Sequence, residues 1–186
     1  MTALAADGRP RCDWAVSTPD YLLYHDEEWG REIRDDAGLY ERLTLEAFQS
    51  GLSWITILRK RPAFREAFAG FDPEVVAGYG DDEFDRLMAD AGIVRNRLKI
   101  AAAITNARAV LDLGEGGLTD LLWSFAPEVA SVPKTLADIP PSTPESKALS
   151  KTLKKNGFVF VGPTTCYAMM QATGIVNDHL ADCIAR

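Results

Sequence analysis

The chain contains two histidines and three cysteines, and four of these five residues are spaced as metal ligands would be. His179 and Cys183 stand four positions apart, a spacing that would place both side chains on one face of a helical turn, within reach of one ion. Near the other end of the chain, twelve residues separate Cys12 from His25. Two cysteines and two histidines would complete the tetrahedral coordination of zinc and leave no position for water. The pattern predicts one structural zinc ion (Zn2+) that joins the N- and C-terminal segments, against the simpler alternative of buried cysteines and ordinary histidines.

A carboxylate inside an apolar helical stretch is a second candidate for chemistry. Glu46 follows Leu43 by about one helical turn and must either face solvent or line a pocket that offers a donor or a cation. Aromatic rings could form the walls of such a pocket, because their faces stack on nucleobases and attract positive charge. The available rings are those of Trp14, Tyr21, Tyr24 and Trp54. Taken singly, each ring could equally belong to the hydrophobic core.

A short connection bounded by Gly157 and Gly162 lies between two predicted helices. Glycine allows a tight turn whose backbone N–H groups can approach a phosphate, while the following helix points its N-terminal dipole at the same place. Lys151, Lys154 and Lys155 precede this turn. The pattern is typical of a helix-hairpin-helix element that binds DNA, although two packed helices in any bundle can give it.

The elements that would position these residues are helices. Apolar residues recur at helical spacing over residues 35–58, as one or two helices bent at Gly51, and again over 81–91, 95–113, 145–156 and 163–174. Glycine, proline and small polar residues predict loops over 112–119 and 132–144. Because no strand pattern competes, the sequence predicts an all-α fold.

The composition is that of a single globular domain. With 186 residues, 47% of them hydrophobic, the chain can bury a sizeable core. We expect one helical domain over residues 11–186, preceded by a disordered extension over residues 1–10. No apolar run approaches the roughly 20 residues of a membrane span, and the N-terminus lacks the layout of a signal peptide. A cytoplasmic monomer without membrane association is therefore expected, in which cysteine favours metal binding over disulfides.

The net charge of −7 opposes non-specific adhesion to polyanions. A role on nucleic acid would therefore need local basic patches. Three are present, over residues 59–61, 95–99 and 151–155. Each alone is more commonly a solvated helix face, so together they are only a hint of a nucleic-acid partner.

Short segments spread over residues 11–183 together resemble the 3-methyladenine DNA glycosylase I family of bacterial alkylation-repair enzymes. The matching segments are RCDW (11–14), YHDEEWG (24–30), LE (45–46), QSGLSWIT (49–56), DAGI (90–93), WSF (123–125), GFVFVG (157–162) and VNDH (176–179). The resemblance implies the helix-hairpin-helix DNA glycosylase fold, with zinc on the four residues named above.

The resemblance also implies a reaction. Family members flip 3-methyladenine out of double-stranded DNA and hydrolyse its N-glycosidic bond, which releases the free base and leaves an abasic site. By resemblance Glu46 contacts the base and serves catalysis, Trp54 stacks on it, and Trp14, Tyr21 and Tyr24 complete the pocket. Leu52, at the bend after Gly51, is the candidate wedge that fills the vacated stack.

One position departs from the wider superfamily. Asn177 occupies the place at which many members carry a catalytic aspartate, and we expect the adjacent Asp178 to be structural. No lysine stands at a nucleophile position, so a monofunctional glycosylase without lyase activity is expected. The alternative is a zinc-stapled module that binds damaged bases without catalysis, and a zinc hydrolase is disfavoured because four ligands leave no open site.

Overall fold

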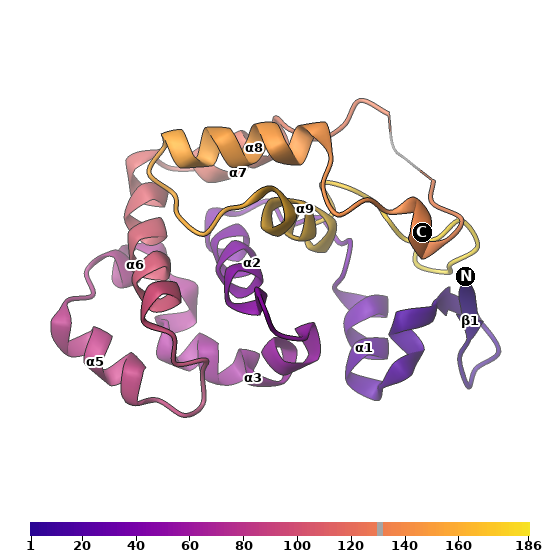
Figure 1. The fold of residues 1–186 in the computed structure, drawn as a ribbon, viewed down its shortest axis with the longest axis horizontal. Coiled ribbons are helices and arrows are strands. Elements are labelled where there is room, and N and C mark those ends of the chain that lie inside the picture. The colour runs from indigo at the N-terminus through magenta and orange to yellow at the C-terminus, as the bar shows by residue number, and fades with distance from the viewer. Residues whose placement is uncertain (130–131) are drawn as a thin grey trace.

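A computed structural model describes residues 1–129 and 132–186, and its fold is all-α, as the sequence predicts. Figure 1 shows the helices arranged around α2, with both chain termini at the same end of the molecule. The helices are α1 (Pro19–Glu27), α2 (Asp36–Gln49), α3 (Trp54–Ala67), α4 (Pro73–Ala77), α5 (Asp81–Ala89), α6 (Arg97–Asp112), α7 (Gly117–Trp123), α8 (Pro144–Lys155) and α9 (Pro163–Ala172). Single 3-10 turns lie at η1 (Asp13–Ser17), η2 (Ala69–Phe71) and η3 (Leu136–Asp138).

Helix α2 is the centre of the hydrophobic core. It packs against α3, α6, α7 and α9, and every residue from Leu39 to Phe48 is buried. Asp35 starts the helix because its carboxylate accepts a hydrogen bond from the N–H of Gly38, at 2.7 Å. A helix covered on all sides buries its polar residues as well, and this is why Glu46 cannot reach bulk solvent.

The predicted bend at Gly51 separates α2 from α3. Gly51 has a φ of 82°, in the left-handed region that glycine adopts without a steric penalty. The other predicted helices agree with α5, α6, α8 and α9 to within a few residues. Three short helices, α1, α4 and α7, were not predicted, and α7 begins inside the loop expected over residues 112–119. Each has fewer than ten residues, too few to show a clear apolar period.

Residues 1–10 form part of a hairpin where the sequence suggests disorder. Strand β1 (Thr2–Leu4) pairs antiparallel with β2 (Pro10–Cys12), so that Thr2 lies opposite Cys12. The guanidinium of Arg11 holds the hairpin together, because it binds the carboxylates of Asp7 and Asp26 at 2.8 Å. The C-terminus also contacts this hairpin, since the N–H of Ile184 donates to the carbonyl of Pro10 at 3.1 Å.

The C-terminal segment after α9 is irregular. Gly174 has a φ of 75°, and a Cβ at this position would lie 2.9 Å from the backbone of residues 30–32. This close approach lets the segment cross the end of α1 and reach the N-terminal hairpin. In the described residues no helix is long and apolar enough to cross a membrane.

Candidate active site and metal cluster

The four predicted metal ligands converge in the structure. The ligand atoms of Cys12, His25, His179 and Cys183 all lie within 4.8 Å of one another, and all four residues are buried. His179 Nδ1 is 3.2 Å from His25 Nε2, and Cys183 Sγ is 3.3 Å from His25 Nε2 and 3.7 Å from His179 Nδ1. Bond lengths typical of tetrahedral zinc would place such atoms about 3.3 to 3.8 Å apart. The donor set therefore fits a four-coordinate ion with closed coordination.

Neighbouring groups fix the orientation of these ligands. His25 Nδ1 is 2.8 Å from a carboxylate oxygen of Asp26, and His179 Nε2 is 3.0 Å from the carbonyl of Trp29. These contacts leave the other nitrogen of each ring facing the cluster. Metal-bound histidines usually have such a partner on their second nitrogen. Burial lowers the pKa of both histidines, that of His179 to about 4, so both rings are neutral and able to ligate at pH 7.

The potential ligands come from the two ends of the chain, but His179 and Cys183 do not lie on a helix as their spacing suggests. Cys12 ends β2 and His25 lies in the last turn of α1. His179 and Cys183 lie in the irregular C-terminal segment, so the predicted helical turn is wrong. Gly30 makes room for them: a Cβ there would lie 2.9 Å from His179 Nε2. The convergence therefore depends on loop geometry that periodicity cannot show.

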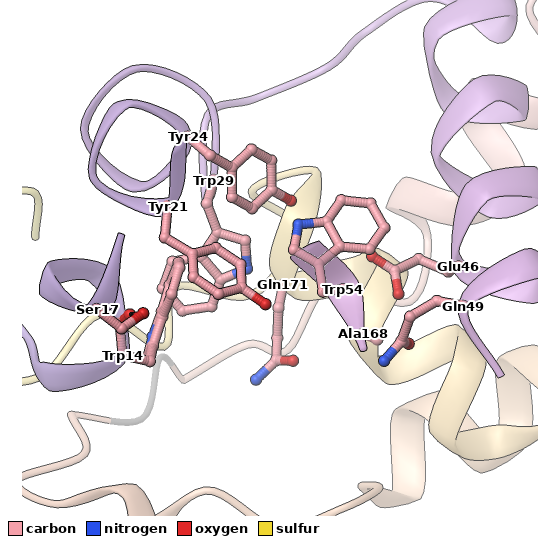
Figure 2. Close-up of a pocket in the computed structure, with 10 residues that line it drawn as sticks. All are labelled: Trp14, Ser17, Tyr21, Tyr24, Trp29, Glu46, Gln49, Trp54, Ala168 and Gln171. Atoms are coloured by element: carbon pink, nitrogen blue, oxygen red, sulfur yellow. Dashed lines mark hydrogen bonds between the residues drawn. The ribbon is translucent and has the colours of Figure 1, made fainter. Parts of the chain in front are cut away.

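A cavity of about 300 Å³ opens beside the cluster. Its lining residues come from the segment between Cys12 and His25, from α2 and α3, and from α9. They are Trp14, Ser17, Tyr21, Tyr24, Trp29, Glu46, Gln49, Trp54, Ala168 and Gln171. Figure 2 shows the aromatic rings of the N-terminal segment on one side and Glu46 and Gln49 on the other, with Trp54 between them. All five residues predicted to form a base-binding pocket therefore line one cavity.

Glu46 is the one carboxylate among these lining residues. Its side chain is only 6% exposed, and no hydrogen bond among residues 1–129 and 132–186 ends on its carboxylate. Burial raises the pKa of Glu46 to about 8, opposed by the nearby positive charge of Arg42. An acceptor held without a donor in an aromatic cavity is suited to a ligand that brings its own N–H groups or positive charge.

Trp54 and Tyr21 are held by the junction of α1 with α3. The hydroxyl of Tyr21 accepts a hydrogen bond from the N–H of Ile55, at 2.9 Å, in the first turn of α3. Trp54 packs against Tyr24, with ring centroids 5.5 Å apart. Its indole N–H is buried and has no hydrogen-bond partner among the described residues. Trp54 therefore lines the cavity with its ring, while its indole N–H is an unsatisfied donor inside the protein.

Beneath the pocket, Glu28 joins α1 to α2 and α3. Its carboxylate accepts from Arg61 at 2.6 and 2.7 Å and from Arg42 at 2.8 Å. Burial alone would raise the pKa of Glu28, but the two guanidinium groups hold it at about 2. This partly buried ion pair ties the end of α1, one turn after Tyr24, to the helices opposite.

Several lining residues were missed by sequence reasoning, namely Ser17, Trp29, Gln49, Ala168 and Gln171. Two of them, Trp29 and Gln49, lie in segments that carry the family resemblance, and the resemblance could have indicated their place in the pocket. Gln171 and Ala168 lie on α9, which was predicted only as part of a DNA-binding hairpin. Asp178 is buried behind them and accepts a hydrogen bond from Gln171, which agrees with a structural role.

The connection between α8 and α9 is held by α6 on one side and is exposed to solvent on the other. Asn106 on α6 donates to the carbonyl of Val159 and accepts from its N–H, at 3.0 and 2.8 Å. Phe158 and Val161 are buried, while Val159 and Phe160 are exposed. Lys151, Lys154 and Lys155 are exposed on α8, and Gly157 and Gly162 bound the turn. The predicted DNA-binding residues therefore share the region around one hairpin.

Leu52 lies at the tip of the turn between α2 and α3 and is 40% exposed. The turn is anchored, since the backbone N–H of Leu52 donates to the carbonyl of Gln49 at 2.7 Å. Lys99 adds a second anchor: its ammonium is buried and donates to the carbonyls of Phe48 and Ser50 at 2.8 and 2.6 Å. An apolar side chain on a rigid turn beside the cavity is well placed to insert between bases.

The basic patch over residues 59–61 serves mainly to tie helices together. Arg59 pairs with Asp20, and Arg61 is bound to Glu28. Lys60 donates to the carbonyls of Ala91 and Gly92. In the second patch Lys99 is buried but Arg95 and Arg97 are exposed, and residues 151–155 keep three exposed lysines, so both patches retain cations that a phosphate backbone could contact.

Comparison with known proteins gives a consistent result over nearly the whole chain. The profile of the methyladenine glycosylase family matches residues 14–186. DNA-3-methyladenine glycosylase 1 of Escherichia coli (strain K12) is 49% identical over 178 residues, which cover 93% of this chain and 95% of that protein. A crystal structure of 3-methyladenine DNA glycosylase I superposes with a TM-score of 0.90 at 46% identity, covering 95% of this chain and 99% of that one. A tyrosine-to-phenylalanine variant of such an enzyme, solved in complex with 3-methyladenine, gives a TM-score of 0.88 at 35% identity, covering 94% of this chain and 96% of that one.

Proposed function

The chain belongs to the methyladenine glycosylase family, and we propose that it hydrolyses the N-glycosidic bond of 3-methyladenine in DNA with Glu46 as its base-contacting carboxylate. The observation that carries the assignment of Glu46 is its position: a buried acceptor without a donor, in a cavity walled by aromatic rings. The relatives are named for release of this base, and one was solved with the free base bound.

The chemistry explains why a carboxylate is needed. Methylation at N3 gives the nucleotide base a positive charge, so the base leaves as a neutral molecule when the bond from its N9 to the sugar C1′ breaks. Water adds to C1′ and loses a proton to solvent, which leaves a hydroxyl group on the sugar. Glu46 accepts a hydrogen bond from the exocyclic amine, and the positive charge of the bound base favours the ionised form of its carboxyl group, while Trp54 stacks on the ring. Trp14, Tyr21 and Tyr24 exclude water from around the bound base.

The reaction needs no lysine nucleophile. Strand-cleaving lyases form a Schiff base through a lysine amine. None of the described residues that line the cavity is a lysine. The enzyme is therefore a monofunctional glycosylase that leaves an abasic site and an uncut strand.

DNA is held by two elements on either side of the pocket. The hairpin bounded by Gly157 and Gly162, with Lys151, Lys154 and Lys155, contacts the phosphate backbone. Leu52 fills the space in the stack that the flipped base leaves, at a cost of a few kcal/mol for unstacking. The continuous core from α2 to α9 supports a single catalytic domain over residues 11–186, and the enzyme acts as a monomer.

Cys12, His25, His179 and Cys183 would hold one structural zinc ion. Support comes from the two thiol and two imidazole ligands and from separations that suit tetrahedral coordination. When bound, zinc would supply only cross-linking of the two chain ends, since four protein ligands leave no site for water. The aromatic residues between Cys12 and His25 are thereby fixed against α2.

The test is incubation of the protein with N-methylated double-stranded DNA, followed by chromatography of the released bases. Free 3-methyladenine is the expected product, with no strand cleavage until alkali is added. Tight binding of the alkylated DNA without release would instead support a damaged-base-binding module.

A further inference from the structure

The side-chain amide of Gln171 is held by a buried carboxylate behind the base pocket. Gln171 lines the cavity from α9, and its Nε2 donates to Asp178 Oδ2 at 2.8 Å. The hydroxyl of Tyr167 donates to the same oxygen at 2.5 Å. Asp178 is only 2% exposed, so these contacts are shielded from solvent. Burial and the neighbouring carboxylate raise the pKa of Tyr167, which keeps its hydroxyl a donor at neutral pH.

The chemistry of this contact fixes which way the amide faces. An ionised carboxylate has acceptors only, whereas a glutamine amide has one acceptor and two donors. Gln171 must therefore turn its nitrogen toward Asp178, because the reversed amide would place two oxygens against each other. Figure 2 shows the nitrogen of Gln171 on the side away from Trp54 and its oxygen on the side of Trp54 and Ala168. Gln171 therefore presents its side-chain oxygen, a hydrogen-bond acceptor, to the pocket.

An acceptor at this place distinguishes the two purines. Adenine carries an exocyclic amine with two hydrogens at the position where guanine carries a carbonyl oxygen. The amine can donate one hydrogen to Glu46 and the other to Gln171, both of which line the cavity. A guanine carbonyl at the same position would face two acceptors and find no donor, which a buried site penalises.

We infer that Asp178 is a positioning residue that locks Gln171 as a hydrogen-bond acceptor and thereby selects methylated adenine over methylated guanine. This inference rests on the proposed function, because it assumes that the cavity receives the base. It gives Asp178 a task beyond the fold, carried out through Gln171 and without contact with the base.

The experiment is a double-mutant cycle on the full chain, read out as selectivity. Wild type, Asp178→Asn, Gln171→Met and the double variant are each incubated with methylated DNA, and kcat/KM is measured for release of 3-methyladenine and of 3-methylguanine. Asp178→Asn keeps the size of the side chain but adds a donor, which allows the Gln171 amide to reverse. Gln171→Met keeps the length and removes both polar groups.

Asp36→Asn is the matched control. Asp36 also accepts two hydrogen bonds from another element, from the N–H and hydroxyl of Thr119, and lies outside the cavity. Zinc content and melting temperature are recorded for every variant, because Asp178 adjoins His179. The expected result is a fall of about tenfold in the adenine-to-guanine ratio for Asp178→Asn and for Gln171→Met, with no further fall in the double variant. Asp36→Asn should keep the wild-type ratio.

Three results would overturn the inference. In the first, Asp178→Asn lowers both rates equally and keeps the ratio, as loss of fold alone would do. In the second, the two single effects add in the double variant. In the third, Gln171→Met keeps the wild-type ratio, and this variant decides the matter if Asp178→Asn does not fold. A wild type that releases neither base would instead reject the proposed function itself.

Discussion

His25 Nε2 and His179 Nδ1 lie 3.2 Å apart, although 154 positions separate the two residues in the sequence. The second nitrogen of each ring contacts a fixed oxygen, of Asp26 or of the Trp29 carbonyl. The two rings therefore cannot turn away from each other without losing a buried contact. This geometry clamps the segment that carries Trp14, one wall of the base pocket, to the end of the chain.

Replacing one ligand should remove both the metal and much of the stability. His179→Ala leaves three ligands in a buried site, and structural zinc can contribute on the order of 10 kcal/mol in small domains. We expect purified wild type to carry one zinc per chain, and His179→Ala or Cys12→Ser to carry little and to melt at a clearly lower temperature. Elemental analysis and thermal unfolding measure both quantities.

Cys166→Ser provides the control for the metal prediction. Cys166 is equally buried, but its thiol contacts the carbonyl of Val161 on the hairpin and lies outside the cluster. This variant should keep its zinc. Wild-type protein with well under one zinc per chain would contradict the site.

Glu46→Gln should lower activity and leave the fold intact. The change keeps the shape of the side chain but removes a carboxyl group that can ionise beside the cationic base, and loss of one such electrostatic contact costs on the order of 10²-fold in rate. Zinc content should not change. If zinc and activity fell together, Glu46 would be a residue of the fold and not of the reaction.

Glu46 should also impose a pH dependence on stability. Its ordinary pKa of 4.5 rises to about 8 in the folded chain because the side chain is buried. Between these two values the unfolded chain has lost a proton that the folded chain keeps, so the contribution of Glu46 to stability falls as pH rises through this window, by up to about 1.4 kcal/mol per pH unit. Urea unfolding at pH 5, 7 and 9 should show a decline in wild type that is smaller in Glu46→Gln. Parallel curves for the two proteins would argue against the raised pKa.

Leu52→Ala should impair excision from duplex DNA more than excision from single strands. The wedge is needed only where a neighbouring stack must be held open. The variant should bind the free base as wild type does, because the cavity does not include Leu52, and the fluorescence of the tryptophans that line the cavity can follow this binding. Leu111→Ala, at an exposed leucine of α6, is the matched control. An equal loss on both substrates would show that Leu52 acts by some route other than base stacking.

The chemistry-bearing residues were predictable because their types are rare and their partners are few. With only two histidines in the chain, a Cys2His2 set had little choice, and all four ligands converge. Glu46 stood out because a carboxylate in an apolar helix needs a reason. What the sequence could not reveal was how the segments meet: His179 and Cys183 join the cluster of potential ligands from an irregular loop, although their spacing suggests a helix.

The basic patches also show that the sequence does not reveal tertiary contacts. Charge along the sequence cannot show whether a cation faces solvent or another protein group: Lys99 is buried and binds backbone carbonyls, and the partly buried Arg61 binds the Glu28 carboxylate. Gln171 was missed for a related reason, since a glutamine carries no charge and its meaning depends on Asp178 behind it. Tertiary contacts decide such roles, and periodicity does not encode them.

Changing Lys154 and Lys155 to glutamine should weaken DNA binding in a salt-dependent way. Both side chains are exposed in the last turn of α8, directly before the hairpin turn at Gly157. Each phosphate contact that is lost should reduce the slope of log K against log salt by about 0.9 for duplex DNA. The double variant is therefore expected to lose up to about two units of slope, with free-base binding unchanged. Lys147→Gln, at an exposed lysine two turns earlier on α8, should alter the slope by less than either change at the hairpin. If all three lysines had the same effect, the charge of the whole helix and not the hairpin would guide the DNA, and the placement of the phosphate contacts would have to be revised.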